Sequence, residues 1–204
     1  MTKTVKLFCA AALALATFTA SAGGYQIGET VKSFTLKNVN GKMVSLDDYK
    51  KSKGVMVIFT CNHCPFSKMY EQRIIDLHKT YTAKGYDVVA INSNDPKVVP
   101  DDSYDKMVDL ARKKKYPFPY LYDETQDIAR AFGATRTPHV FVLANEGNNF
   151  VIKYIGAIDN NAEDAKAADK KYVNESVNEL LAGKEVTTKQ TKAIGCSIKW
   201  KVQE

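Results

Sequence analysis

Two cysteines and a histidine lie within four consecutive residues of the chain. The segment "TCNHCP" places Cys61 and Cys64 on either side of a dipeptide whose second residue is His63, and Pro65 follows. Two thiols at this spacing can form and break a disulfide reversibly, with the thiolate as the reactive form. The segment therefore indicates thiol–disulfide chemistry.

The same spacing also supplies half of a zinc site, so a metal has to be considered. A closed zinc site takes two more ligands, usually as a second close pair. The remaining candidates are isolated along the chain: His78, His139 and Cys196. We therefore expect no metal.

The elements around the cysteine pair decide how each sulfur is presented. The apolar run "GVMVIFT" predicts a buried strand over 54–60, and apolar residues recur at helical spacing after the cysteines. A helix N-terminus carries unpaired N–H groups and a partial positive charge, which stabilise a thiolate. With Asn62 as the helix cap and Pro65 in the first turn, we expect an accessible Cys61 with a pKa of roughly 3.5 to 7.5. Cys61 would attack a partner's disulfide, and Cys64 would resolve the mixed disulfide.

His63 is a second influence on the protonation of the two sulfurs, besides the helix N-terminus. A positive or dipolar imidazole would stabilise the reduced, thiolate form, which makes the disulfide a stronger oxidant. We therefore expect a reduction potential toward the oxidising end of the range of roughly −120 to −270 mV. The alternative is a solvent-facing histidine without a tuning role.

A Thr-Pro pair far downstream is the second chemical signal. Thr137 and Pro138 immediately precede the apolar run "HVFVL". Proline does not fit inside a central strand, so Pro138 should lie at the start of one. A cis peptide bond there would turn the Thr137 backbone toward a neighbouring site, whereas a trans bond is the commoner arrangement.

The N-terminus predicts a secretory signal peptide over 1–22. Lys3 and Lys6 form a basic leader, 7–18 is apolar, and "ASA" at 20–22 is a small-residue cleavage signature. The apolar run is too short to span a bilayer, which needs roughly 20 residues. We therefore expect export, to the periplasm or beyond it, where disulfides persist.

Charge and composition exclude several classes of function. The net charge of +6 belongs to a chain in which Lys and Arg (29) are mixed with Asp and Glu (23), as on a solvated surface rather than a nucleic-acid footprint. No later apolar run reaches membrane-spanning length, and no phosphate-binding glycine loop appears. We expect neither an organic cofactor nor a nucleic-acid partner, and no membrane contact after cleavage.

The remaining pattern predicts an α/β fold. Asn40-Gly41 between alternating apolar residues signals a hairpin, and 86–93 reads as a second buried strand. Helices over 62–84 and 103–115 supply the crossovers that parallel strands need. A hairpin around Gly147 follows, and then a helical stripe from Ala165 to Leu181. These elements predict a mixed central sheet flanked by helices, with an N-terminal β-hairpin.

Together these motifs resemble the thioredoxin superfamily. The segments "GETVKSFTLKNVNGKMVSLDDY" and "VVAINSND" are similar to its redoxin branch, which includes alkyl-hydroperoxide-reductase-like (AhpC/TSA) and periplasmic thiol–disulfide proteins. The segments "FTCNHCPF", "PYLYDETQDIARAFGATRTP" and "GCSIKW" resemble the peroxiredoxin-like thioredoxin proteins. The resemblance covers about 27–201. It implies a thioredoxin-like domain over 23–183, followed by a C-terminal tail, 184–204, packed on or near it.

The resemblance also implies roles for single residues. Cys61 is then the nucleophile of a thiol–disulfide oxidoreductase and Cys64 the resolving thiol. Pro138 is the cis-proline, and the Thr137 backbone pairs with a bound peptide. The partners are protein or small-molecule thiols and disulfides.

The sequence departs from the family at several points. Thr60 stands where thioredoxins usually carry Trp, and the strand before the cysteines lacks the usual buried acid, so Glu71 or a water is the candidate proton acceptor for Cys64. The peroxiredoxin pattern P-x-x-x-T-x-x-C fits neither Cys61 nor Cys64. Thiol-dependent peroxide reduction therefore stays an alternative function.

Three more residues have open roles. Arg136 either supports the Cys61 thiolate or is an ordinary surface or ion-paired arginine. His139 would join the cysteine pair if the protein were a thioredoxin-fold copper-binding protein, the second alternative. Cys196 is expected to be a buried, inert thiol, with a third redox partner or a disulfide between chains as alternatives, so the oligomeric state stays open.

Overall fold

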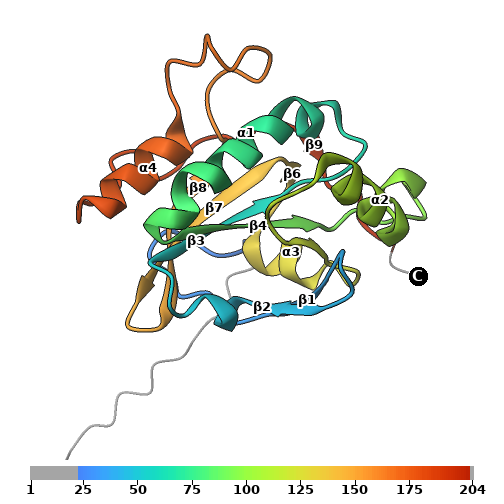
Figure 1. The fold of residues 1–204 in the computed structure, drawn as a ribbon, viewed down its shortest axis with the longest axis horizontal. Helices are drawn as coiled ribbons and strands as arrows, with labels where there is room; N and C mark the ends of the chain where they lie inside the picture. Colours follow the sequence, from blue (N-terminus) through green and yellow to red (C-terminus); the bar gives the residue numbers. More distant parts are fainter. Residues whose placement is uncertain (1–22, 203–204) are drawn as a thin grey trace, which may run out of the picture.

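A mixed sheet of seven strands forms the centre of the molecule (Figure 1). The computed structural model describes residues 23–202, so the predicted leader, 1–22, lies outside the described residues. The strand order is β2-β1-β5-β4-β3-β7-β8. The strands are β1 (Thr35–Asn38), β2 (Met43–Ser45), β3 (Gly54–Phe59), β4 (Tyr86–Asn92), β5 (Tyr120–Tyr122), β7 (His139–Glu146) and β8 (Asn149–Gly156).

The strand directions follow from the connections. β3, β4 and β5 are parallel neighbours, and α1 (Pro65–Tyr81) and α2 (Tyr104–Lys114) provide the two crossovers between them. β7 pairs antiparallel with β3 and β8, and β1 pairs antiparallel with β2 and β5. The β1–β2 hairpin turns at Gly41, whose φ of 82° suits glycine. The predicted mixed sheet with an N-terminal hairpin is confirmed.

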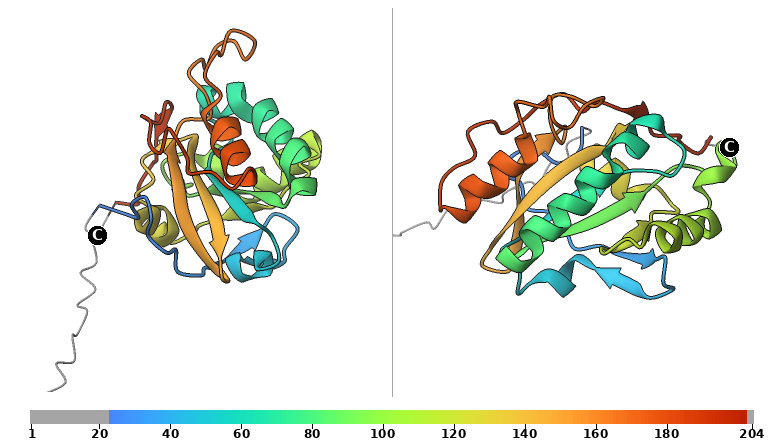
Figure 2. Two further views of the ribbon diagram at one scale, coloured as in Figure 1. Left: turned by 90° about the vertical axis from the view of Figure 1, so that its left-hand side faces the viewer. Right: turned by 45° about the horizontal axis from the view of Figure 1, so that its top comes forward.

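Helices cover both faces of the sheet (Figures 1 and 2). On β3, Met56 and Ile58 pack into one cluster with α1, α2 and α4 (Tyr172–Leu181). Val57 and Phe59, which point the other way, pack with α3 (Asp127–Phe132) on the opposite face. Short 3₁₀ turns complete the helical segments: η1 (Leu46–Tyr49), η2 (Thr82–Lys84) and η3 (Pro100–Asp102). No helix within residues 23–202 has the length and apolar character that crossing a bilayer needs.

The helix before the tail is shorter than the sequence pattern predicts. Ala165 and Ala168 lie in an irregular loop, and α4 begins at Tyr172. Asn160 closes this loop, because its side chain donates to Asp169 (2.5 Å) and accepts from the Lys170 N–H (3.2 Å). These local polar contacts compete with the helical backbone pattern.

After α4 the chain runs back across the molecule to the end of the sheet where α1 begins (Figure 2). There β9 (Cys196–Ser197) pairs antiparallel with β6 (Arg136–Thr137) as a separate two-stranded sheet. The buried Ile198 side chain joins the α3 side of the core, and Trp200 packs against the same cluster. The tail is thus fixed beside the residues that carry the cysteine motif.

Candidate active site

The cysteine motif links the end of β3 to the start of α1. Pro65 is the first residue of α1, and Cys64 is its N-cap. Proline is favoured at this first position because its missing N–H would have no helical partner. The prediction that Asn62 caps the helix is wrong, since Pro65 sets the helix start two residues later. Asn62 is instead buried, with its side chain bonded to the Tyr120 hydroxyl (2.9 Å) and the Asp101 carbonyl (2.8 Å).

The disulfide in the structure joins Cys64 to Cys196, whose Cα atoms are 6.2 Å apart, and leaves Cys61 as a free, buried thiol. The expected disulfide within the CxxC motif is therefore not the one observed. The interpretation of Cys196 as an inert thiol is also wrong. The cause is the β6–β9 pairing, which sets Cys196 opposite Thr137 and carries its sulfur to the N-cap of α1.

Thr137 lies between the two sulfurs of the motif. The Thr137–Pro138 peptide bond is cis, one of the two arrangements that the sequence allows. The buried Thr137 hydroxyl lies 3.3 Å from the Cys61 sulfur, and its carbonyl oxygen lies 3.3 Å from the Cys64 sulfur. Its backbone is paired with Cys196. Whether Thr137 and Pro138 position a substrate stays a prediction.

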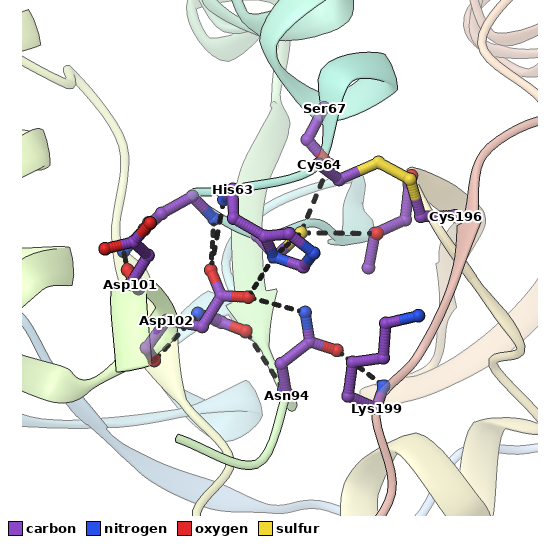
Figure 3. A network of polar contacts seen from close by, with 12 residues as sticks. His63, Cys64, Ser67, Asn94, Asp101, Asp102, Cys196 and Lys199 are labelled. Atoms are coloured by element: carbon purple, nitrogen blue, oxygen red, sulfur yellow. Dashed lines mark hydrogen bonds and ion pairs between the residues drawn. A yellow bond between two sulfur atoms is a disulfide. The ribbon is translucent and has the colours of Figure 1, made fainter. Parts of the chain in front are cut away.

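A buried carboxylate that sequence reasoning missed, Asp102, completes the site (Figure 3). It ends η3 just before α2, and its side chain is 0% exposed. One oxygen accepts the backbone N–H groups of Asn62 (2.7 Å) and His63 (3.2 Å). The other accepts His63 Nδ1 (2.5 Å) and Asn94 Nδ2 (2.7 Å). The "PDDS" segment gave one signal, an acid next to a helix-capping serine, but nothing in it marks this acid as buried.

His63 lies between Cys61 and this carboxylate. Its Nδ1 is 3.7 Å from the Cys61 sulfur and 2.5 Å from Asp102 Oδ2. A carboxylate accepts hydrogen bonds, so Nδ1 is the protonated nitrogen of the ring and donates a hydrogen bond to Asp102. The histidine is near the sulfur, as predicted, but its closest polar partner is an acid whose negative charge opposes a thiolate.

The pKa of the Cys61 thiol is raised from its ordinary value. Burial is the main cause, and the negative charge of Asp102 adds to it. Hydrogen bonds from the Thr137 hydroxyl, the Cys64 backbone N–H and the Ser67 hydroxyl act in the opposite direction. The expected low pKa is therefore wrong for this disulfide state, because burial and the Asp102 charge outweigh these hydrogen bonds.

Asn94 joins this inner network to the C-terminal tail. Its Nδ2 donates to Asp102, and its Oδ1 accepts the Lys199 backbone N–H (2.8 Å), three residues beyond Cys196 (Figure 3). The Asp95 N–H donates in turn to the Lys199 carbonyl (2.9 Å). A shift of the tail would therefore disturb a residue that holds Asp102.

Two other predicted candidates lie apart from the sulfurs. Arg136 is exposed, and its backbone pairs with Ser197. Glu71 is engaged by Lys114 (2.6 Å) and the Tyr116 hydroxyl (2.8 Å), with no hydrogen bond to Cys64. Among the described residues, Arg136 therefore makes no hydrogen bond to Cys61, whose side-chain partners are His63, Ser67 and Thr137, and Glu71 makes none to Cys64.

The histidines bear on the metal alternatives. His139 is buried, which lowers its pKa to about 4, and it accepts the Thr135 N–H (3.4 Å). Within residues 23–202, the one group of three ligand atoms close enough to share a metal is the Cys61 sulfur, His63 Nδ1 and an Asp102 oxygen, within 4.8 Å of one another. His139 is not part of it. Asp102 already accepts four N–H groups, so this cluster is satisfied without an ion.

Comparisons with known proteins place the chain among redox proteins. A profile of the AhpC/TSA family matches residues 27–160. The chain is 24% identical over 121 residues to the thiol-disulfide oxidoreductase ResA of Geobacillus thermodenitrificans, covering 59% of this chain and 65% of the relative. It is 29% identical over 106 residues to the chloroplastic peroxiredoxin Q of Populus jackii, covering 52% and 46%. The chain thus spans about two thirds and about half of the length of these relatives.

A solved structure matches over most of the chain. The crystal structure of an uncharacterized conserved protein from Geobacillus kaustophilus has a TM-score of 0.81 and 37% identity to this chain. The match covers 88% of this chain and 94% of that one.

Proposed function

The chain belongs to the AhpC/TSA family and has a thioredoxin-like fold, and from this premise we propose that it is an exported thiol–disulfide oxidoreductase. Its redox centre is then a set of three cysteines that share one disulfide. The observation that carries the proposal is the free Cys61 thiol beside the Cys64–Cys196 disulfide, with Thr137 in contact with both motif sulfurs.

The internal step is an exchange between the three sulfurs. The Cys61 thiolate attacks the Cys64 sulfur, so that the Cys61–Cys64 bond forms and the Cys64–Cys196 bond breaks. The electron pair leaves on the Cys196 sulfur, which takes up a proton from solvent. One disulfide and one thiol are present before and after the step, so no external oxidant is consumed.

The partner step uses the edge of β6. In this state β9 pairs with that edge, so a strand from the same chain lies where an extended partner segment would pair with Thr137. Exchange to Cys61–Cys64 frees Cys196 and with it the covalent hold on the tail. A partner thiolate then attacks the motif disulfide, or, in the opposite direction, the reduced motif attacks a partner's disulfide.

Export fits this chemistry. The predicted leader, 1–22, directs the chain to a compartment in which a disulfide persists. Mass spectrometry of the processed protein from the periplasmic fraction should give a chain that begins after Ala22. A full-length chain retained in the cytoplasm would contradict export.

Peroxide reduction is not favoured by the site. The peroxiredoxin pattern P-x-x-x-T-x-x-C fits neither Cys61 nor Cys64, and the free Cys61 thiol has the Cys64–Cys196 disulfide beside it as a reaction partner. Thiol–disulfide exchange therefore stays the proposed reaction.

Turnover of a peptide disulfide, with dithiothreitol as the electron donor, tests the proposal. The wild type should accelerate the reaction, and Cys61→Ser should lose most of that acceleration while it keeps the Cys64–Cys196 linkage. Cys9→Ser, a change within the predicted leader, is the matched control in the full-length chain. The proposal is wrong if Cys61→Ser turns over at the wild-type rate or if the wild type shows no acceleration.

A further inference from the structure

A cavity of about 300 Å³ has Cys61 in its wall. It lies between α1, α2 and the segment that enters β5, and Cys61, Thr60 and Ser67 are among its lining residues. Its volume is at the lower end of the range of small-molecule sites, roughly 300–1,000 Å³. It has room for a small molecule rather than for a folded partner.

The charged residues of this cavity are mostly lysines. Lys114 pairs with Glu71 (2.6 Å), and Glu71 also accepts the Tyr116 hydroxyl, so this acid is already balanced. Lys68 and Lys113 line the same cavity and make no ion pair within residues 23–202. The cavity therefore has an excess of positive charge, which favours an anionic ligand.

Part of the cavity wall is apolar, because Ile74, Leu110, Phe118 and Tyr120 also line it. A ligand that fits this arrangement has a short apolar part that reaches the sulfur and an anionic end that stays near the lysines.

We propose that this cavity binds a low-molecular-mass disulfide that carries carboxylates and delivers it to Cys61. The inference rests on the proposed function and names one substrate class for it. In this state Cys61 is the thiol, so its reaction partner must be a disulfide. The Cys61 sulfur bonds to one ligand sulfur, the ligand S–S bond breaks, and the released thiolate takes up the proton that Cys61 loses. Cys61–SH and RSSR thus give Cys61–SSR and RSH.

Three symmetric disulfides of different charge test the inference on the oxidised protein. The probes are 3,3′-dithiodipropionate with two carboxylates, bis(2-hydroxyethyl) disulfide without charge, and cystamine with two ammonium groups. Each rate of mixed-disulfide formation is divided by the rate with N-acetylcysteine at the same pH, because leaving-group pKa values differ. Intact mass gives the adduct, and peptide mapping places it on Cys61 or on Cys196.

The dianionic probe should be preferred over the dicationic probe by about tenfold, the lower end of the range for electrostatic steering. The preference should fall as salt is added. The double variant Lys68→Gln/Lys113→Gln should lose most of it. The control Lys79→Gln/Lys106→Gln removes two exposed lysines of the same helices that do not line the cavity, and it should keep the preference.

The outcomes separate this inference from the proposed function. Equal normalised rates for the three probes overturn the substrate class, although reaction at Cys61 itself would support disulfide exchange. A preference that survives in Lys68→Gln/Lys113→Gln overturns the cavity as its cause. If Cys61 reacts with none of the probes while the Cys61–Cys64 linkage still forms, only the small-molecule inference fails. If that linkage is also absent, the proposed function fails with it.

Discussion

Cys61 and Cys64 belong to one short motif, yet they lie in different surroundings. Cys64 is the N-cap of α1, is bonded to Cys196 of the tail, and has its sulfur 3.3 Å from the Thr137 carbonyl oxygen. Cys61 lies outside the helix, is buried, and faces the Asp102 carboxylate, so its pKa is raised. The spacing of the motif brings the sulfurs together, but the first helical residue, Pro65, decides which cysteine lies at the helix N-terminus. That cysteine is Cys64, so Cys61 does not have the helix-cap position that the sequence pattern suggested.

The largest difference between the two cysteines should appear in turnover. Cys64 is the sulfur common to the observed Cys64–Cys196 disulfide and the proposed Cys61–Cys64 disulfide. Cys64→Ser removes both linkages, so turnover of a peptide disulfide should fall by at least about 10³-fold. Cys196→Ser leaves the Cys61–Cys64 pair and should keep measurable turnover. If Cys64→Ser stays within tenfold of the wild type, Cys64 is not the central sulfur.

The second difference concerns stability. The Cys64–Cys196 disulfide closes a loop with a sequence separation of 132 residues. Cys196→Ser should lower the free energy of unfolding by about 2–4 kcal/mol, as measured by denaturant titration. The wild type in excess dithiothreitol is the control and should match the variant. A variant as stable as the oxidised wild type would mean that the tail disulfide does not hold the fold.

The carboxylate beside Cys61 provides the third test. Asp102→Asn removes the negative charge that helps to raise the Cys61 pKa, so the pKa should fall and the thiolate fraction at neutral pH should rise. Alkylation of Cys61 by iodoacetamide should then be about tenfold faster for a fall of one pKa unit. Asp101→Asn, which changes the neighbouring exposed carboxylate, is the matched control and should leave the rate unchanged. An unchanged or slower rate in Asp102→Asn would show that the carboxylate does not suppress the thiolate.

The fourth test concerns Asn94, the residue that connects Asp102 to the C-terminal tail. Asn94→Ala removes the hydrogen bonds to Asp102 and to the Lys199 backbone N–H. These two hydrogen bonds together stabilise the position of the tail by about 1–2 kcal/mol. Without them, the Cys64–Cys196 disulfide should be roughly five- to thirtyfold easier to reduce in a dithiothreitol titration. It should also shift the pH–rate profile of Cys61 alkylation, which a purely local loss at the tail would not do.

The control for this coupling is Lys199→Ala, since the bond uses the backbone of Lys199 and survives the loss of its side chain. Its reduction midpoint should equal that of the wild type. If Lys199→Ala and Asn94→Ala behave alike, the coupling does not run through the Asn94 hydrogen bonds.

Much of the fold follows from local sequence patterns. The apolar run of β3 and the Asn40-Gly41 turn are correctly predicted because strand burial and hairpin turns are decided by neighbouring residues. The pairing of β6 with β9 could not be predicted, since each strand has two residues and they lie far apart in the chain. The partner of Cys64 was missed for the same reason.

The site divides in a similar way. Cys61, Cys64 and Thr137 are found by their motifs, and the structure brings them into contact. Asp102 is not found, because its burial depends on how η3 packs under the cysteine loop, and this packing leaves no local pattern. Burial, together with the Asp102 charge, reverses the expected direction of the Cys61 pKa, so a sequence motif alone gives the wrong electrostatics.

Disulfide mapping as a function of pH tests the central claim most directly. Exchange from Cys64–Cys196 to Cys61–Cys64 replaces a free, buried Cys61, whose pKa is raised, by a free Cys196 on the tail, which is less buried and therefore loses less hydration as a thiolate. Rising pH favours the arrangement that frees the more acidic thiol. Non-reducing peptide mapping after acid quenching should therefore give mainly Cys64–Cys196 from mildly acidic solution and a growing share of Cys61–Cys64 as the solution becomes alkaline. A Cys64–Cys196 disulfide that never exchanges with Cys61 at any pH would contradict the account.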